Sequence, residues 1–287
     1  EKSQASGNPF FINLWIHEPH TPFHVDPKLQ KRFAELGEKD AIYAATLFHA
    51  DLRIGQLLDA LDRLNLAKDT LVIFSSDNGP ARGAPDAPLT LGYDSATGLG
   101  YGIAAAKGVT GGRRAYKGAL LEGGIGVPFI ARWPGKIAAD KVDKTSIFSA
   151  VDLLPTFCEI AGVKLPASYR PDGISQVATL KGKGTAIREK PLFWKTVAPW
   201  PARKTKPDHW VSYAVVSKNW KLVSNRDAKY VELYDLVDDP LEKKDLKEKY
   251  PARVTQLKKM LSQWQGTLPA KPTGNVFSNL RNPKKTK

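Results

Sequence analysis

The sequence is poor in the residues that build cross-links and membrane spans. It contains one cysteine among 287 residues, Cys158, which excludes a disulfide within the chain and any zinc site made of several cysteines. It has no run of about 18 apolar residues, so no membrane span is expected. Glu1 to Asn8 lacks the basic and apolar regions of a signal peptide, and we interpret it as an interior cut followed by a loop.

Acidic residues are scarce relative to basic ones. The 29 Asp and Glu stand against 43 Lys and Arg, which leaves a net charge of +14. Such an excess attracts anions through the summed field of the surface, although it also keeps a surface soluble. No nucleic-acid-binding signature accompanies the charge, so we expect a sulfated or phosphorylated partner and no nucleic acid.

Apolar patterning predicts an α/β domain over residues 1–187. The apolar runs Phe10 to Ile16, Thr70 to Ser75 and Val127 to Arg132 are typical of buried strands, and Asp40 to Leu64 has the period of an amphipathic helix. A strand, helix, strand order predicts a mostly parallel sheet flanked by helices. A short helix, Asp152 to Ala161, should end at Gly162.

A smaller α+β domain is expected over residues 188–268, followed by a loose basic tail over 269–287. Lys218-Asn219 predicts a hairpin tip, and Pro251 suits the first position of a helix whose apolar stripe packs on an antiparallel sheet. The expected strands are Leu192 to Lys195, Trp210 to Val216, Trp220 to Ser224 and Tyr230 to Leu236.

Two polar groups directly follow predicted strands, where open α/β sheets bind ligands. His17-Glu18-Pro19-His20 follows the first strand, and His20 can bind an anionic oxygen or protonate a leaving group, or simply cap a turn. Asp77-Asn78 follows the next strand and offers two oxygen ligands suited to Ca²⁺ or Mg²⁺. Asn78-Gly79 is also a hairpin signal, but no alternating strand follows it.

Lys117 lies in a glycine-rich stretch that is too long for a passive connection. The residues around it do not form a phosphate-binding loop, because that motif needs Gly before the Lys and Ser or Thr after it. Taken alone, Lys117 is a solvated loop lysine. Cys158 sits in a predicted helix, where a free cysteine is usually a small buried hydrophobe, so we do not propose it as a nucleophile.

The order of these motifs resembles the sulfatase family of the alkaline phosphatase superfamily over nearly the whole chain. The matching segments are Pro19-His20-Thr21-Pro22, Phe74 to Pro80, Lys117-Gly118 with Glu122-Gly123-Gly124, Val127 to Gly135, Asp152 to Thr156, Asp172-Gly173, and Glu232 to Leu236 with Asp239-Pro240. The segments around Gly135 and Pro155 resemble bacterial arylsulfatases likened to N-acetylgalactosamine-6-sulfatase. One departure is Gly126, where relatives often have Arg.

The resemblance implies a Ca²⁺-dependent sulfuric ester hydrolase acting on a sulfated sugar or glycan. It implies that Asp77 and Asn78 bind the ion, that His20 and Lys117 hold sulfate oxygens with His17 nearby, and that His20 protonates the departing alcohol. The family's nucleophile is a formylglycine made in a Cys-X-Pro-Ser-Arg segment, which this sequence lacks. The nucleophile is therefore expected outside these residues, and this chain alone is expected to be inactive.

Two other functions remain open on the sequence. A phosphomonoesterase or phosphodiesterase of the same superfamily could use the same metal, histidine and lysine. A non-catalytic protein could instead hold sulfated glycans through its basic surface. The resemblance implies a periplasmic or extracellular location, and the oligomeric state is not predicted.

Overall fold

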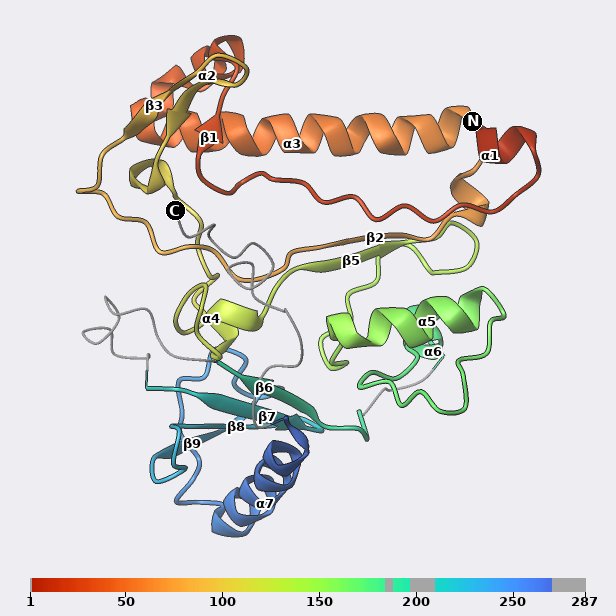
Figure 1. The fold of residues 1–287 in the computed structure, drawn as a ribbon, viewed down its shortest axis with the longest axis vertical. Helices are drawn as coiled ribbons and strands as arrows, with labels where there is room; N and C mark the ends of the chain where they lie inside the picture. The colour runs from red at the N-terminus through yellow and green to blue at the C-terminus, as the bar shows by residue number, and fades with distance from the viewer. Residues whose placement is uncertain (1, 184–187, 197–209, 270–287) are drawn as a thin grey trace, which may run out of the picture. The chain divides into compact units, whose positions relative to one another are not determined.

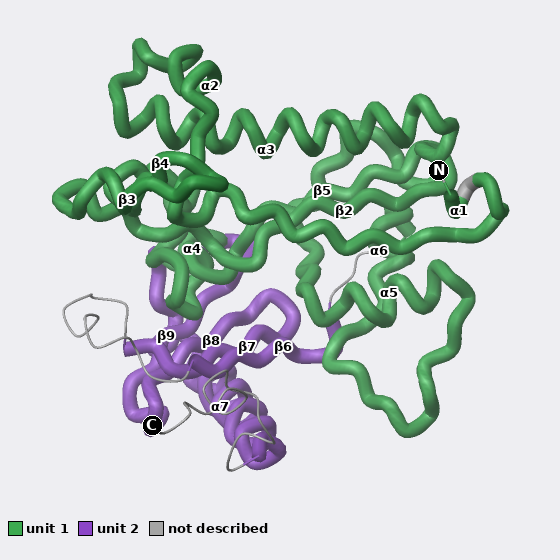
Figure 2. The backbone as a smooth tube through the Cα atoms, turned by 45° about the horizontal axis from the view of Figure 1, so that its top comes forward, with its two compact units in different colours: residues 1–187, 240–242 green, residues 188–239, 243–287 purple. Residues whose placement is uncertain are grey.

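The computed structural model describes residues 2–183, 188–196 and 210–269. The chain divides into two compact units, which are residues 1–187 with 240–242 and residues 188–239 with 243–287 (Figure 2). The predicted tail over 269–287 lies, apart from its first residue, outside the described residues.

The first unit contains one long helix, α3, together with several short helices and strands (Figure 1). Its strands are β1 (Phe23–His24), β2 (Val72–Ser75), β3 (Thr90–Asp94), β4 (Gly98–Tyr101) and β5 (Phe129–Arg132). Its helices are α1 (Lys2–Ala5), α2 (Pro27–Arg32), α3 (Glu38–Arg63), α4 (Glu122–Ile125), α5 (Leu153–Ile160) and α6 (Val177–Leu180), with 3-10 turns at Ala34–Leu36, Ala67–Asp69, Ile103–Ala105 and Ala150–Asp152.

Helix α3 confirms the amphipathic pattern. Glu38 and Asp40 lie in its first turn and Arg63 in its last, which suits the helix dipole. Ala41 and Ile42 are fully buried, and Ile42 packs with Phe23 in a small core. Among the described residues, no helix is both long and apolar enough to cross a membrane.

The described strands pair only in the antiparallel sense. Strand β2 pairs with β5 so that Val72 faces Arg132 and Ser75 faces Phe129, while β1, β4 and β3 form a second sheet. The expected α/β class and the strands β2 and β5 are confirmed, and each of these two strands is two residues shorter than predicted. The parallel pairing expected from the strand, helix, strand order is not found among the described strands.

The prediction that Phe10 to Ile16 forms a buried strand is wrong for this structure. The segment is not assigned to any strand, and its side chains are exposed, including 73% of Phe11 and 87% of Trp15. A strand exists only when a neighbouring strand accepts and donates its backbone hydrogen bonds, and no described strand does so here. Apolar composition alone therefore predicted the wrong secondary structure and the wrong burial for this segment.

The second unit is an antiparallel sheet with one helix, as predicted. Strands β6 (Leu192–Lys195), β7 (Tyr213–Ser217), β8 (Trp220–Ser224) and β9 (Val231–Asp235) pair in that order, and α7 (Pro251–Thr267) follows. Lys218 adopts a φ of 57° at the predicted hairpin tip. Leu257 and Leu261 of α7 are buried against the sheet residue Leu222, which confirms the apolar stripe.

Candidate active site

Asp77 and Asn78 lie just beyond the end of β2. The Asp77 carboxylate is exposed, and its nearest described donor is the Ser76 hydroxyl at 3.5 Å. The half-buried Asn78 donates through Nδ2 to the carbonyl of Gly79 at 2.9 Å, which fixes the carboxamide and turns its oxygen away from that bond. The loop therefore presents a carboxylate and an amide oxygen on adjacent residues.

Lys117 is held against the same loop by backbone hydrogen bonds. The Lys117 N–H donates to the carbonyl of Pro80 at 2.9 Å, and the Gly79 N–H donates to the carbonyl of Gly124 at 2.9 Å. We call this pair of hydrogen bonds the loop clasp. It joins two segments that are 37 or more residues apart, and it brings the Asp77-Asn78 loop and the Lys117 loop together.

The glycines of both motifs are required by this close approach. A Cβ added to Gly79 would overlap the carbonyl oxygen of Gly123, and one added to Gly123 would overlap the carbonyl oxygens of Arg114 and Ala115. Only glycine lets the backbones come so near to one another. The Asn-Gly and Glu-Gly-Gly patterns therefore reflect packing between loops, and the hairpin interpretation of Asn78-Gly79 does not apply.

A residue that the sequence analysis did not single out supports the Lys117 loop. Glu242 is 1% exposed and accepts a hydrogen bond from the Glu122 N–H at 2.6 Å, at the first residue of α4. The two residues are 120 positions apart. Glu242 also has a φ of 55°, which a sequence does not reveal for a residue other than glycine.

His17 and His20 lie together in the turn that precedes β1. The His20 N–H donates to the carbonyl of His17 at 2.9 Å, and the two rings meet edge to face at 5.8 Å. The Nδ1 of His20 lies 2.7 Å from the carbonyl oxygen of Thr21. A carbonyl can only accept, so Nδ1 carries hydrogen, and Nε2 takes no part in this hydrogen bond.

The same turn is tied to α3 through a third histidine, His49. His49 Nδ1 lies 3.3 Å from the Glu18 carboxylate, and the Arg53 Nε donates to His49 Nε2 at 3.2 Å. Because the guanidinium is always a donor, Nε2 must accept and the proton sits on Nδ1. The contact with His49 therefore holds Glu18, which lies between His17 and His20 in the sequence.

A chain of packing contacts leads from the histidine turn to the loop clasp. The Phe23 ring meets the Tyr43 ring edge to face, with 5.9 Å between the ring centroids. Gly108 packs closely against both the Tyr43 hydroxyl and Pro80, since a Cβ added to Gly108 would lie 3.0 Å from that hydroxyl and 2.5 Å from the Pro80 Cβ. Burial raises the pKa of the Tyr43 phenol, so it stays neutral. Among the described residues, no hydrogen bond or ion pair joins His20 to Lys117, Asp77 or Asn78, and their convergence remains a prediction.

The side-chain oxygens of the Asp77-Asn78 loop suit a hard divalent cation. Asp77 and Asn78 supply two oxygen ligands, which is the chemistry that Ca²⁺ and Mg²⁺ prefer. Within residues 2–183, 188–196 and 210–269, no group of three or more His, Cys, Asp or Glu side chains could hold a metal. Asp77 and Asn78 therefore fit two ligand positions of such a site.

Comparisons with known proteins identify the family that the chain resembles. The Sulfatase family model matches residues 1–163, and the model described as N-sulphoglucosamine sulphohydrolase, C-terminal, matches residues 115–267. An N-acetylgalactosamine-6-O-sulfatase of Bacteroides thetaiotaomicron is 27% identical over 267 residues, which cover 88% of this chain and 46% of the relative. Human arylsulfatase A is 31% identical over 192 residues, covering 67% of this chain and 32% of the relative.

Solved structures agree on the fold. The crystal structure of Ps i-CgsB matches with a TM-score of 0.72 and 25% identity, covering 92% of this chain and 51% of that chain. The PsFucS1 sulfatase of Pseudoalteromonas sp. matches with a TM-score of 0.62 and 23% identity, covering 92% and 50%. The chain thus spans about half the length of these two structures and of the Bacteroides relative, and less of arylsulfatase A.

Proposed function

Because the chain belongs to the sulfatase family, whose model matches residues 1–163, we propose that the protein hydrolyses sulfate esters of a sugar or glycan. The observation that carries this proposal is the loop clasp, which holds the Asp77-Asn78 loop beside the Lys117 loop. Hydrolysis of a sulfate ester needs preorganised positive charge around the oxygens of the sulfuryl group. The two loops that the clasp joins supply one cation, the Lys117 ammonium, and two oxygen ligands for a divalent metal ion.

The roles of the residues follow from their chemistry. Asp77 and Asn78 would hold Ca²⁺, or Mg²⁺, which when bound would neutralise charge on the sulfuryl oxygens. The half-buried Lys117 ammonium binds another of these oxygens as a point charge. His20, with its Nδ1 engaged by Thr21, presents Nε2 to the substrate, and His17 lies beside it to bind the same anion.

The departing alcohol of a sugar needs a proton, because a sugar alkoxide is a poor leaving group near neutral pH. His20 can donate that proton from Nε2 when its ring is protonated, while Nδ1 keeps its hydrogen bond to the Thr21 carbonyl. No Cys-X-Pro-Ser-Arg segment occurs among the 287 residues, and half-buried Cys158 lies on α5. We therefore place the formylglycine nucleophile outside this sequence.

The metal site can be tested in the whole polypeptide that contains this chain. Replacing Asp77 by Ala should remove the bound divalent ion, measured by elemental analysis, and should lower kcat/KM for a sulfate ester by about 10²- to 10³-fold, as for loss of one preorganised electrostatic group. Asp51→Ala, an exposed carboxylate on α3, is the matched control and should change neither value. Unchanged metal content in Asp77→Ala would overturn the assignment.

The same preparation separates sulfate from phosphate chemistry. A sulfate ester and the phosphate ester of the same alcohol should be compared under identical conditions, because metal, lysine and histidine suit both groups. We expect the sulfate ester to be turned over with the higher kcat/KM. Faster turnover of the phosphate ester would assign the protein to the phosphatases, and turnover of neither would favour a binding protein.

A further inference from the structure

We infer that a groove beside the histidine turn is a carbohydrate subsite, which binds the unsulfated sugar next to the one that carries the scissile sulfate. This inference rests on the proposed function and deepens it. The groove has a volume of about 480 Å³ and lies between β1, the start of α2 and the hairpin of β3 and β4. That volume falls within the usual range for sites that bind small molecules.

The walls of the groove combine aromatic rings with polar groups. Tyr93 and Tyr101 come from neighbouring strands of the hairpin, while Gln30 and Thr97 add an amide and a hydroxyl. The C–H face of a sugar ring packs on an aromatic ring, and its hydroxyls need donors and acceptors around the edge. The groove offers both kinds of contact within one hollow.

Tyr93 is the most informative of these residues. It is 77% exposed, and every residue of its strand β3 is exposed as well. A large aromatic side chain left in water on a short hairpin contributes little to folding, since burial is what makes aromatic residues stabilising. Exposed aromatic surface of this kind often marks a place where a ligand binds.

His24 adds an unused polar atom to the same wall. Its Nδ1 is shielded from solvent and has no hydrogen-bond partner in the structure. The ring lies over Gly100, where a Cβ would stand 3.3 Å from the His24 Cε1, so glycine at this position makes the room for it. Buried polar atoms nearly always have partners, so this unpaired nitrogen is an unusual feature of the groove wall.

The charges around the groove favour a neutral sugar over a sulfate group. None of the described residues that line it is Lys or Arg, and the lining includes the acidic residue Asp26, whose carboxylate accepts a hydrogen bond from the Lys28 N–H. The nearby Asp94 carboxylate is occupied by the Thr97 hydroxyl and by two backbone N–H groups at 2.9 to 3.0 Å, and these hydrogen bonds, that of the Thr97 side chain first, lower the pKa of Asp94. An anion would therefore meet negative charge here without a cation to offset it.

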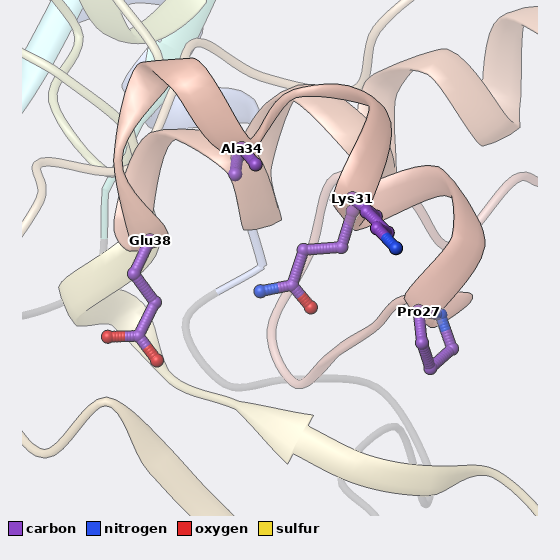
Figure 3. A pocket seen from close by; sticks show the side chains of 6 residues that line it. Pro27, Lys31, Ala34 and Glu38 are labelled. Atoms are coloured by element: carbon purple, nitrogen blue, oxygen red, sulfur yellow. The ribbon is translucent and has the colours of Figure 1, made fainter.

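Position along the chain links the groove to the proposed reaction. His24 follows His20 by four residues, so the two Cα atoms lie within about 14 Å of one another, a distance that a short oligosaccharide spans. The adjoining hollow shares Pro27 and Gln30 with the groove and contains Lys31 and Glu38 (Figure 3). It contains no aromatic residue, so we assign the subsite to the Tyr93 side of α2.

Substrate length provides the test. In the whole polypeptide, kcat/KM should be measured for a panel of sulfated tetrasaccharides, for the sulfated monosaccharide of each, and for 4-nitrophenyl sulfate, which is too small to reach the groove. We expect one tetrasaccharide to be preferred over its monosaccharide. Tyr93→Ala should lower kcat/KM for that tetrasaccharide about tenfold, the loss of one ring-stacking contact, and leave the two small substrates unchanged.

Two further variants make the result specific. Tyr93→Phe keeps the ring and should retain most of the preference for the tetrasaccharide. Tyr169→Ala removes another exposed tyrosine, outside the groove, and should behave as wild type. The subsite would be overturned if the wild type cleaves 4-nitrophenyl sulfate but prefers no tetrasaccharide over its monosaccharide. It would also be overturned if Tyr93→Ala lowers kcat/KM equally for all substrates. Failure of the wild type to cleave any sulfate ester would instead overturn the proposed function.

Discussion

At the scale of single residues, His20 has the most sharply defined chemistry. The hydrogen bond from Nδ1 to the Thr21 carbonyl fixes which nitrogen faces outward, and the ring stays exposed to an incoming substrate. Lys117 differs from it, because an ammonium on a flexible stem binds an anion as a point charge and is not proposed to protonate the leaving group. The two residues can therefore be told apart by the leaving group of the substrate.

His20→Ala should cost about 10²- to 10⁴-fold in kcat/KM for a sugar sulfate, the usual contribution of a general acid. The loss should be much smaller for 4-nitrophenyl sulfate, whose phenolate leaves without a proton. Lys117→Ala is the comparison, and it should slow both substrates to a similar degree. Equal losses in His20→Ala for the two substrates would show that His20 only binds the sulfate group.

At the scale of elements, the loop after β2 and the loop before α4 act as one piece. The backbones meet so closely at Gly79 and Gly123 that neither position has room for a side chain. Glycine usually lowers the stability of the folded state, because it gives the unfolded chain more conformational freedom to lose on folding. Its presence at positions 79 and 123 therefore reflects the close packing of the two backbones. The same residue type should therefore respond in opposite ways at different positions.

Gly79→Ala should destabilise the protein by about 1 to 3 kcal/mol, since the new methyl group overlaps backbone atoms that cannot move aside. It should also weaken binding of the divalent ion, because Asn78 precedes it directly. Gly55→Ala, inside α3 with nothing within 4 Å of the new Cβ, should stabilise by about 0.5 to 1 kcal/mol. Thermal unfolding measures both changes, and a Gly79→Ala protein as stable as wild type would contradict the clasp.

At the scale of the whole molecule, residues far apart in the chain complete the candidate site. The segment 240–242 follows β9 in sequence but belongs to the first unit, where Glu242 binds the first N–H of α4. Its side chain is buried, so the carboxylate was removed from water to make this contact. Glu242 therefore supports the Lys117 loop from a distance of 120 residues.

Glu242→Ala should leave the Glu122 N–H without this acceptor, at a local cost of about 1 to 3 kcal/mol. We expect faster amide hydrogen exchange across residues 115–126, measured by mass spectrometry, and weaker binding of sulfate. Glu242→Gln retains an oxygen acceptor and should restore part of the protection. Glu248→Ala removes an exposed carboxylate and serves as the control, and wild-type exchange in Glu242→Ala would refute the supporting role.

The sequence by itself determined the local elements and the identity of the chemical groups. The period of α3, the hairpin tip at Lys218 and the start of α7 at Pro251 depend on neighbours a few residues away, so local pattern was sufficient. The motifs containing His20, Asp77 and Lys117 were also sufficient to indicate the family, which the family model then confirmed.

Only the tertiary structure decided how these parts meet. Phe10 to Ile16 is as apolar as a buried strand, yet strand formation depends on a hydrogen-bonding neighbour that composition does not specify. The loop clasp and the Glu242 contact likewise join backbone groups across long sequence separations. Such contacts are selected by the packing of the folded chain, and no local pattern of residue types encodes them.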